Sequence, residues 1–282
     1  MNEFPDIKLI ATDLDDTLLG PGQALSEENK NALLRCIANG IHVVAATGRA
    51  ESAVPKEILS IAEIRYLICS NGARIIDRDA GEVLFAKYID EAAVDHIIPL
   101  LHDPEILTEV FWNGDPYAEA DRIADPKRYG VPDSFLDYFI SSRLATQGLA
   151  AFAMAHRTEI EKFHFTFPGP AQKDRIWRHL QKAGKLYEIT SSLGFNLEVD
   201  GLGVNKAAGV KFIADRLGIG QKETMCIGDN ANDISMIAYA GIGVAVENAV
   251  ADAKAAADYI TKRNDENGVA RAIERFVLNG PR

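Results

Sequence analysis

The chain has 282 residues, enough for one large domain or two smaller ones. Its 41 acidic and 30 basic residues give a formal net charge of −11, which argues against non-specific binding to nucleic acid or to an anionic membrane, because both need basic surfaces. No apolar run reaches the length of a membrane span, and the first residues lack the pattern of a signal peptide. We therefore expect a cytoplasmic protein with no nucleic-acid or membrane partner.

The first part of the chain alternates short apolar runs with helical patterns. Strands are expected over 7–12, 42–47 and 66–71. Ser26 is a suitable N-cap for a helix over 27–39, and a second helix is expected near 51–61 with Pro55 close to its first turn. Strands that are apolar throughout and joined by helices are typical of a parallel sheet covered on both faces.

The middle of the chain has a different pattern. The strand-like pieces at 82–89, 105–112 and 161–168 alternate between polar and apolar residues, which suits a sheet with one covered face. Residues 115–133 are rich in Pro, Asp and Gly and predict a long loop. This pattern indicates an inserted α+β domain over 85–189.

The alternation of apolar strands and helices returns near the C-terminus. Strands are expected over 224–229, 241–246 and 258–261, with helical patterns before and between them. We therefore predict a doubly wound α/β core with a parallel sheet, formed by residues 1–84 and 190–282, which is interrupted by the inserted domain.

Polar residues follow four of the expected core strands, and ligands bind beyond the carboxyl ends of strands in open parallel sheets. These residues are Asp13, Asp15 and Thr17, then Thr47, Gly48 and Arg49, then Ser70, Asn71 and Gly72, and finally Asp229, Asn230, Asn232 and Asp233. If the strands are neighbours, four carboxylates converge. Converging carboxylates require a cation, and an all-oxygen ligand set selects a hard ion such as Mg²⁺.

A metal beside hydroxyl and amide groups is suited to binding a phosphate group. Lys206 opens the expected helix after the insertion, and its ammonium is a suitable charge to neutralise phosphoryl oxygens. A carboxylate can attack phosphorus and form an aspartyl-phosphate. A second carboxylate two residues further along can protonate the leaving group and then activate water.

Simpler interpretations exist for each residue taken singly. The aspartates can belong to a solvated loop edge, and Thr47 can be a helix N-cap. Asn71 and Gly72 fit a tight turn as well as a substrate contact. Lys206 can be a surface lysine. In the insertion, ordinary sheet packing is the expected role of Trp112 and His164.

Four motifs together resemble the haloacid dehalogenase superfamily of phosphatases. They are 13-DLDDT-17, Thr47 in 45-AATGR-49, Lys206, and 228-GDNANDISM-236. The segment 70-SNGA-73 and the long insertion after it resemble the Cof-type branch, which has a type IIB cap. The resemblance covers essentially the whole chain, and the motifs occur in the family's order.

The resemblance implies specific roles at the matching positions. Asp13 would be the nucleophile and a Mg²⁺ ligand, and Asp15 the general acid/base, with its backbone carbonyl on the metal. Thr47 and Lys206 would hold the phosphoryl group. Asp229 would ligate Mg²⁺, and Asp233 would ligate it or orient its waters. The expected substrate-binding residues are Thr17, Gly48, Asn71, Gly72 and Asn232.

The sequence therefore predicts a Mg²⁺-dependent phosphatase for a small phosphorylated metabolite, with sugar phosphates as candidates. A phosphotransferase or phosphomutase of the same superfamily stays open, because an aspartyl-phosphate can pass to a sugar hydroxyl as well as to water. A non-catalytic phosphate-binding protein fits less well, because such a module does not need the Asp13–Asp15 pair. A response-regulator-like receiver would not explain the large insertion. The sequence does not indicate an oligomeric state.

Overall fold

The computed structural model describes residues 5–278. The chain forms two compact units. The core unit comprises Met1–Thr47, Pro55–Leu84 and Asn205–Arg282, and the inserted unit comprises Gly48–Val54 and Phe85–Val204. No helix within residues 5–278 combines the length and the apolar character needed to cross a bilayer.

The core unit is built on a sheet whose strand order, among the described residues, is β14-β13-β12-β1-β2-β3-β4-β5. The strands are β1 Leu9–Thr12, β2 His42–Ala46, β3 Tyr66–Cys69, β4 Arg74–Asp77, β5 Glu82–Ala86, β12 Thr224–Gly228, β13 Ile242–Ala245 and β14 Tyr259–Ile260. All pairs from β14 to β3 are parallel, and β4 is antiparallel to β3. The predicted parallel core sheet is confirmed.

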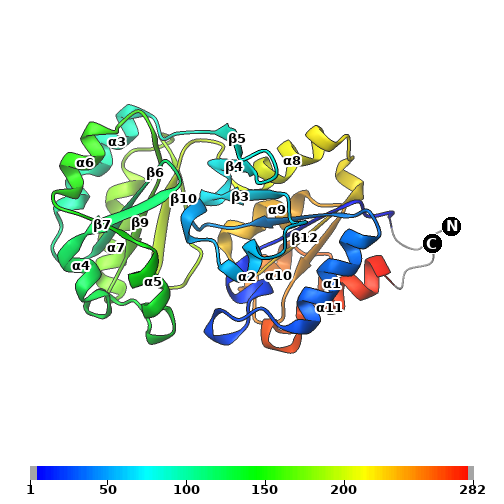
Figure 1. Ribbon diagram of the computed structural model, residues 1–282. Helices are drawn as coiled ribbons and strands as arrows, with labels where there is room; N and C mark the ends of the chain where they lie inside the picture. The colour runs from blue at the N-terminus through cyan, green and yellow to red at the C-terminus, as the bar shows by residue number, and fades with distance from the viewer. Residues whose placement is uncertain (1–4, 279–282) are drawn as a thin grey trace. The chain divides into compact units, whose positions relative to one another are not determined.

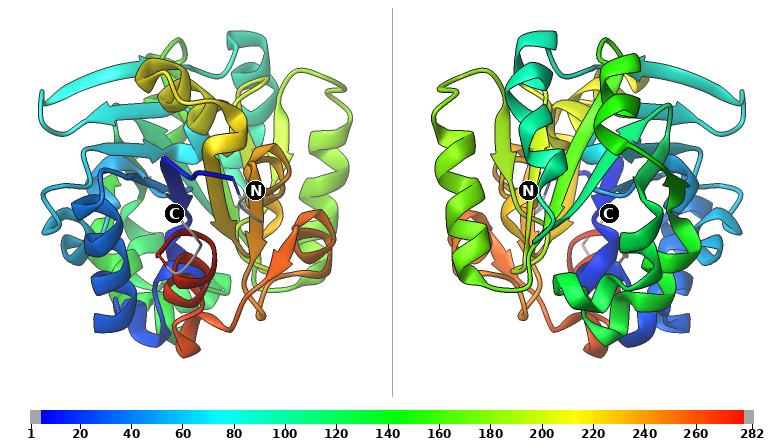
Figure 2. Two further views of the ribbon diagram at one scale, coloured as in Figure 1. Left: turned by 90° about the vertical axis from the view of Figure 1, so that its right-hand side faces the viewer. Right: turned by 90° about the vertical axis from the view of Figure 1, so that its left-hand side faces the viewer.

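Helices cover both faces of this sheet, because the strand order runs from β1 to β3 toward one edge and from β12 to β14 toward the other, and right-handed crossovers in opposite directions place their helices on opposite faces. They are α1 Glu27–Ala38, α2 Lys56–Leu59, α8 Lys206–Leu217, α9 Ile234–Tyr239, α10 Ala251–Ala256 and α11 Gly268–Ile273. Ser26 caps α1 as predicted, because its Oγ accepts a hydrogen bond from Asn29 N at 3.1 Å. Helices α1 and α11 lie side by side although they are far apart in the sequence (Figures 1 and 2), and Ala270 N donates to Asn29 Oδ1 across them at 2.9 Å.

The helix expected over 51–61 is wrong in extent. The segment forms a 3₁₀ turn at Glu51–Ala53 and the short helix α2. Pro55 explains the break, since a proline disfavours helical geometry in the residue before it, and Val54 is extended with φ −69° and ψ 132°.

The inserted unit contains a second sheet with strand order β10-β11-β9-β6-β7-β8. Its strands are β6 Leu107–Trp112, β7 Asp115–Glu119, β8 Leu144–Thr146, β9 Ile160–Thr166, β10 Glu188–Thr190 and β11 Asn196–Asp200, and its helices are α3 Glu91–Ile97, α4 Ala120–Ala124, α5 Leu136–Ser142, α6 Leu149–Ala155 and α7 Pro170–Gln181. Phe163 and Phe165 on β9 belong to an apolar core with residues of α3, α6 and α7, the helices drawn beside this sheet in Figure 1. The α+β class expected for the insertion is confirmed.

Two expectations for the insertion need correction. Residues 115–133 are not a long loop, because they contain β7, α4 and a 3₁₀ turn at Pro126–Tyr129. Asn113 and Gly114, with φ 50° and 81°, make the tight turn that pairs β7 with β6. Residues 190–204, expected in the core, lie in the inserted unit, because β11 pairs with β9.

Candidate active site

Two aspartates lie at the carboxyl ends of neighbouring parallel strands. Asp13 follows β1 and Asp229 follows β12, and these strands are paired in register. Asp13 N continues the ladder by donating to Ile227 O at 2.9 Å. With Asp233, these residues each offer one carboxylate oxygen, and the three oxygens lie within 4.8 Å of one another. All three residues are buried, which excludes a solvated loop edge for them.

Lys206 completes this group, which we call the core cluster: Asp13, Asp229, Asp233 and Lys206. Its Nζ donates to Asp13 Oδ1 and to Asp233 Oδ1, both at 2.5 Å. The lysine side chain is fully buried, so it is not a surface helix lysine. Asn205 caps α8 through a hydrogen bond from Ala208 N to its Oδ1 at 2.9 Å, which fixes the helix start that carries the lysine.

Gly228 permits the position of Asp233. A Cβ atom at residue 228 would lie 2.4 Å from Asp233 Cβ, so any other residue would displace the carboxylate. Asp233 Oδ2 accepts hydrogen bonds from Asp229 N at 2.9 Å and Asn230 N at 3.0 Å. Sequence reasoning did not identify this role, although the glycine stands directly before the acidic motif.

The electrostatics of the core cluster favour binding of a cation. Burial raises the pKa of Asp13 to about 8, and Asp233 and Asp15 add to this effect while Lys206 opposes it. Burial, then Asp233 and Asp13, also raise the pKa of Asp229 well above its usual value. Burial alone would lower the pKa of Lys206, but Asp13 and Asp233 raise it. Three carboxylates against one ammonium, with oxygen donors only, fit a hard divalent cation.

The turn after β1, Leu14–Leu18, carries Asp15 and Thr17. Asp15 is half-buried and extended, and Asp16 has a φ of 58° in the left-handed region. Thr17 was predicted to contact substrate, and here its Oγ1 donates to Asp229 Oδ1 at 2.7 Å. The hydroxyl therefore orients a carboxylate of the core cluster.

The ends of β2 and β3 are tied together in the core unit. Thr47, buried, donates from its backbone N to Ile68 O at 2.8 Å, and Asn71 N donates to Thr47 O at 3.1 Å. No helix begins at Thr47 among the described residues, so an N-cap role does not apply to it. Gly48 falls in the inserted unit.

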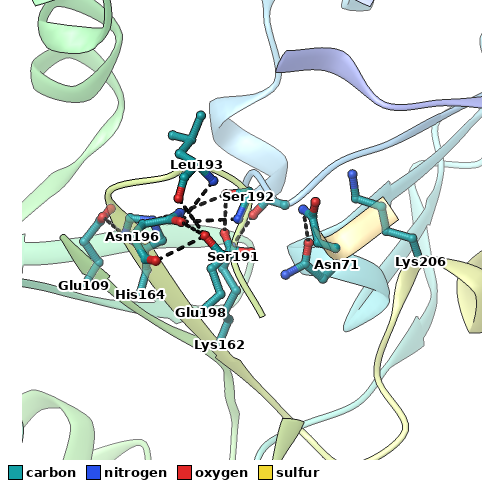
Figure 3. Close-up of polar contacts among 12 residues, drawn as sticks. Asn71, Glu109, Lys162, His164, Ser191, Ser192, Leu193, Asn196, Glu198 and Lys206 are labelled. Carbon is teal, nitrogen blue, oxygen red and sulfur yellow. Dashed lines mark hydrogen bonds and ion pairs between the residues drawn. The ribbon is translucent and has the colours of Figure 1, made fainter. Parts of the chain in front are cut away.

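Asn71 and Gly72 form a turn with left-handed backbone, φ 56° and 102°. Asn232 Nδ2 donates to Asn71 Oδ1 at 3.1 Å (Figure 3), which joins this turn to the loop of the acidic motif. A Cβ atom at Gly72 would lie 2.6 Å from Asn205 O, so the glycine allows the start of α8 to approach. Residues 71–72 therefore form the expected tight turn, and Asn71 also makes a polar contact with Asn232.

The sequence profile of the haloacid dehalogenase-like hydrolases matches residues 10–273. The chain belongs to this family. It is 33% identical over 276 residues to the 5-amino-6-(5-phospho-D-ribitylamino)uracil phosphatase YcsE of Bacillus subtilis, a match that covers 98% of each chain.

Solved structures of haloacid dehalogenase-like hydrolases share both units. A member from B. subtilis is 30% identical with a TM-score of 0.82, covering 96% of this chain and 100% of its own. The subclass IIB sugar phosphatase BT4131 has the same fold, with a TM-score of 0.78 at 24% identity over 95% of this chain and 98% of its own. The protein is therefore an enzyme of the haloacid dehalogenase-like hydrolase family.

A second buried polar group lies within the inserted unit of this hydrolase. This inserted-unit cluster consists of Glu109, Arg143, Lys162, His164 and Glu198. Glu109 contacts Arg143 Nε through Oε1 at 2.6 Å and His164 Nδ1 through Oε2 at 2.5 Å. Glu198 Oε1 accepts from Lys162 Nζ at 3.0 Å (Figure 3). The same ammonium donates to Gly48 O. Packing in the sheet was expected for His164, but the cluster as a whole was not predicted.

Proposed function

We propose that the protein is a Mg²⁺-dependent phosphatase that hydrolyses small phosphorylated metabolites through an aspartyl-phosphate on Asp13. The observation that carries this proposal is the excess of buried carboxylates in the core cluster. Asp13, Asp229 and Asp233 would hold the metal together with the backbone carbonyl of Asp15. Bound Mg²⁺ would favour the ionised carboxylates and polarise the phosphoryl oxygens.

Residues of the chain would carry out nucleophilic attack, phosphoryl binding and proton transfer. The Asp13 carboxylate attacks phosphorus, and the bond from phosphorus to the leaving oxygen breaks. Lys206 and the Thr47 hydroxyl hold the phosphoryl oxygens, with Lys206 neutralising their charge. Asp15 gives its proton to the leaving oxygen, then takes one from the water that releases phosphate from Asp13.

The substrate class is supported by the relatives. The similar B. subtilis protein is named for a phosphoribitylamino pyrimidine, a small phosphorylated metabolite with a polyol chain. We propose substrates of this class, with phosphate on a sugar or polyol, for the present protein. Asn71, Gly72, Gly48 and Asn232 remain proposed substrate contacts.

The test is a panel of phosphorylated metabolites assayed for inorganic phosphate, with Mg²⁺ and with EDTA. We expect phosphate release that requires Mg²⁺ and favours sugar or polyol phosphates over a generic ester. Asp215→Asn is a matched control, because Asp215 is exposed and pairs only with Lys211 among the contacts described. Full turnover in EDTA would contradict the metal. Transfer to a sugar hydroxyl without phosphate release would contradict hydrolysis.

A further inference from the structure

The turn that joins Asp13 to Leu19 is not held by regular secondary structure. It includes an extended Asp15 and a left-handed Asp16, a conformation that is uncommon outside glycine. Thr17 nevertheless reaches Asp229 with a 2.7 Å hydrogen bond. The turn is closed by one backbone bond, from Leu19 N to Leu14 O at 2.8 Å, and contacts from other parts of the core unit hold its remaining carbonyl groups.

Three asparagine side chains bind carbonyl groups of this segment. Asn248 Nδ2 donates to Asp16 O at 2.8 Å, Asn29 Nδ2 to Leu18 O at 3.0 Å, and Asn264 Nδ2 to Leu19 O at 3.0 Å. All three belong to the core unit, although two come from near its C-terminal end. Sequence reasoning singled out none of them, since no periodic pattern or charge marks such a residue.

Asn248, like Asn29, is held at both ends of its amide group, and of the three it is the one that binds the carbonyl nearest to Asp15. Its Oδ1 accepts a hydrogen bond from Asn264 N at 2.9 Å, so the amide group can present only its Nδ2 donor to Asp16 O. An amide with both ends engaged cannot flip without losing both bonds. The orientation of the donor is therefore determined by the backbone of a different loop.

The segment around Asn248 is also attached to the other acidic strand end. Val250 N donates to Asp229 O at 2.9 Å, and Val246 N donates to Gly228 O at 3.2 Å. The segment 246–250 thus contacts the end of β12 through its backbone and the turn after β1 through the Asn248 side chain. It joins the two places where the proposed metal ligands lie.

We propose that Asn248 is a positioning residue for the metal site, which sets the Asp15–Thr17 backbone relative to Asp229. The proposal rests on the proposed function, in which the Asp15 carbonyl and the Asp229 carboxylate hold Mg²⁺. Asn248 would act without touching metal or substrate. Removing its donor leaves the turn without the contact that orients the Asp16–Thr17 peptide, which directly follows the peptide that carries the Asp15 carbonyl.

The test compares Asn248→Ala with the matched control Asn264→Ala, which removes one amide donor from the same segment three residues further on. Mg²⁺ binding to the substrate-free protein is measured by titration calorimetry. We expect Asn248→Ala to weaken Mg²⁺ binding roughly 10- to 100-fold, the usual effect of an outer-shell partner. Asn264→Ala should stay within about threefold. Turnover of Asn248→Ala should recover at saturating Mg²⁺, because the reacting groups remain.

Other results of these measurements would contradict the proposal. Unchanged Mg²⁺ affinity in Asn248→Ala overturns the proposal, and so does equal weakening in both variants, which would indicate general loosening of the turn. If Asn248→Ala does not fold, Asn248→Asp keeps the acceptor for Asn264 N but places a carboxylate oxygen against Asp16 O in place of the donor, so weakening of at least the same size is expected of it. If the wild-type protein binds no Mg²⁺, the proposed function itself is refuted together with this inference.

Discussion

The two buried ionic clusters of this protein differ in charge balance. In the core cluster, carboxylates outnumber cations, and burial raises the pKa of Asp13 to about 8. In the inserted-unit cluster, Glu109 is just as buried, yet Arg143 and His164 overcome the effect of burial and lower its pKa to about 2. Burial alone therefore does not decide ionisation. The unbalanced cluster is the one that calls for an additional cation.

The hydrogen bonds of His164 support a structural role for the inserted-unit cluster. Asn196 Oδ1 accepts from Ser191 Oγ, Ser192 N and Leu193 N, at 2.8, 3.2 and 3.0 Å (Figure 3). Its Nδ2 therefore faces His164 Nε2 at 2.9 Å, and the ring nitrogen must accept. On the other side of the ring, His164 Nδ1 lies against Glu109 Oε2. The cluster pairs two carboxylates with Arg143 and Lys162.

The largest effect is expected from Asp13→Asn in the unbalanced cluster. A neutral amide cannot attack phosphorus effectively and removes one anionic oxygen from the metal set, so turnover should be abolished. Phosphate release from the best substrate measures this, with Asp215→Asn as the matched surface control. A variant that retains measurable turnover would show that another group is the nucleophile.

Asp15→Asn should act differently, because the nucleophile and the metal ligands remain. General acid–base groups typically contribute ~10²–10⁴-fold, so steady-state turnover should fall by about that factor. A nitrophenyl phosphate needs no proton for its leaving group. It should give a burst of released phenol followed by a stall, with the phosphate found on Asp13 by mass spectrometry. Phosphate on Asp15, or wild-type turnover, would reverse the assigned roles.

The comparison also shows which features can be predicted from one sequence. The core strands were predicted because each is an apolar run, and their acidic ends were found because Asp13 and Asp229 stand directly after such runs. The inserted-unit cluster was not, since Glu109 meets His164 through the pairing of β6 with β9 and meets Arg143 from the segment between α5 and β8, both over long sequence separations. The contacts of Asn248 with Asp16 and Asn264 were not predicted either, because they too join residues that are far apart in the sequence.

Glu109→Gln should destabilise the inserted unit without altering the core cluster. The substitution keeps the shape but leaves the buried Arg143 without its counter-charge, and breaking a buried pair costs about 3–5 kcal/mol of unfolding free energy. Hydrogen exchange read by mass spectrometry reports each unit separately. Faster exchange is expected in β6 and β9, with unchanged Mg²⁺ dependence of turnover as the control.

The same cluster should make stability depend on pH in the acidic range. The pKa of Glu109 is about 2 in the folded protein against an ordinary value of 4.5. Because the folded value is the lower one, this stabilisation is complete above about pH 4.5 and is lost as pH falls toward 2. In Glu109→Gln this part of the acid dependence should be absent. An unchanged acid profile would show that Glu109 is not held ionised by its partners.

The smallest expected effect is the stabilisation of the core unit by Mg²⁺. A ligand that binds only the folded state adds about 2.7 kcal/mol of unfolding free energy at 100 times its dissociation constant. In the core cluster Mg²⁺ would also relieve the repulsion between Asp13 and Asp229, whereas the balanced cluster gains nothing from it. Addition of Mg²⁺ should slow hydrogen exchange in β1 and β12 and leave it unchanged in β9.

Asp229→Asn should reduce this protection because one anionic ligand is lost, while Glu109→Gln should retain it in full. Equal protection of both units would mean that Mg²⁺ binds without regard to the charge imbalance from which the metal site is inferred.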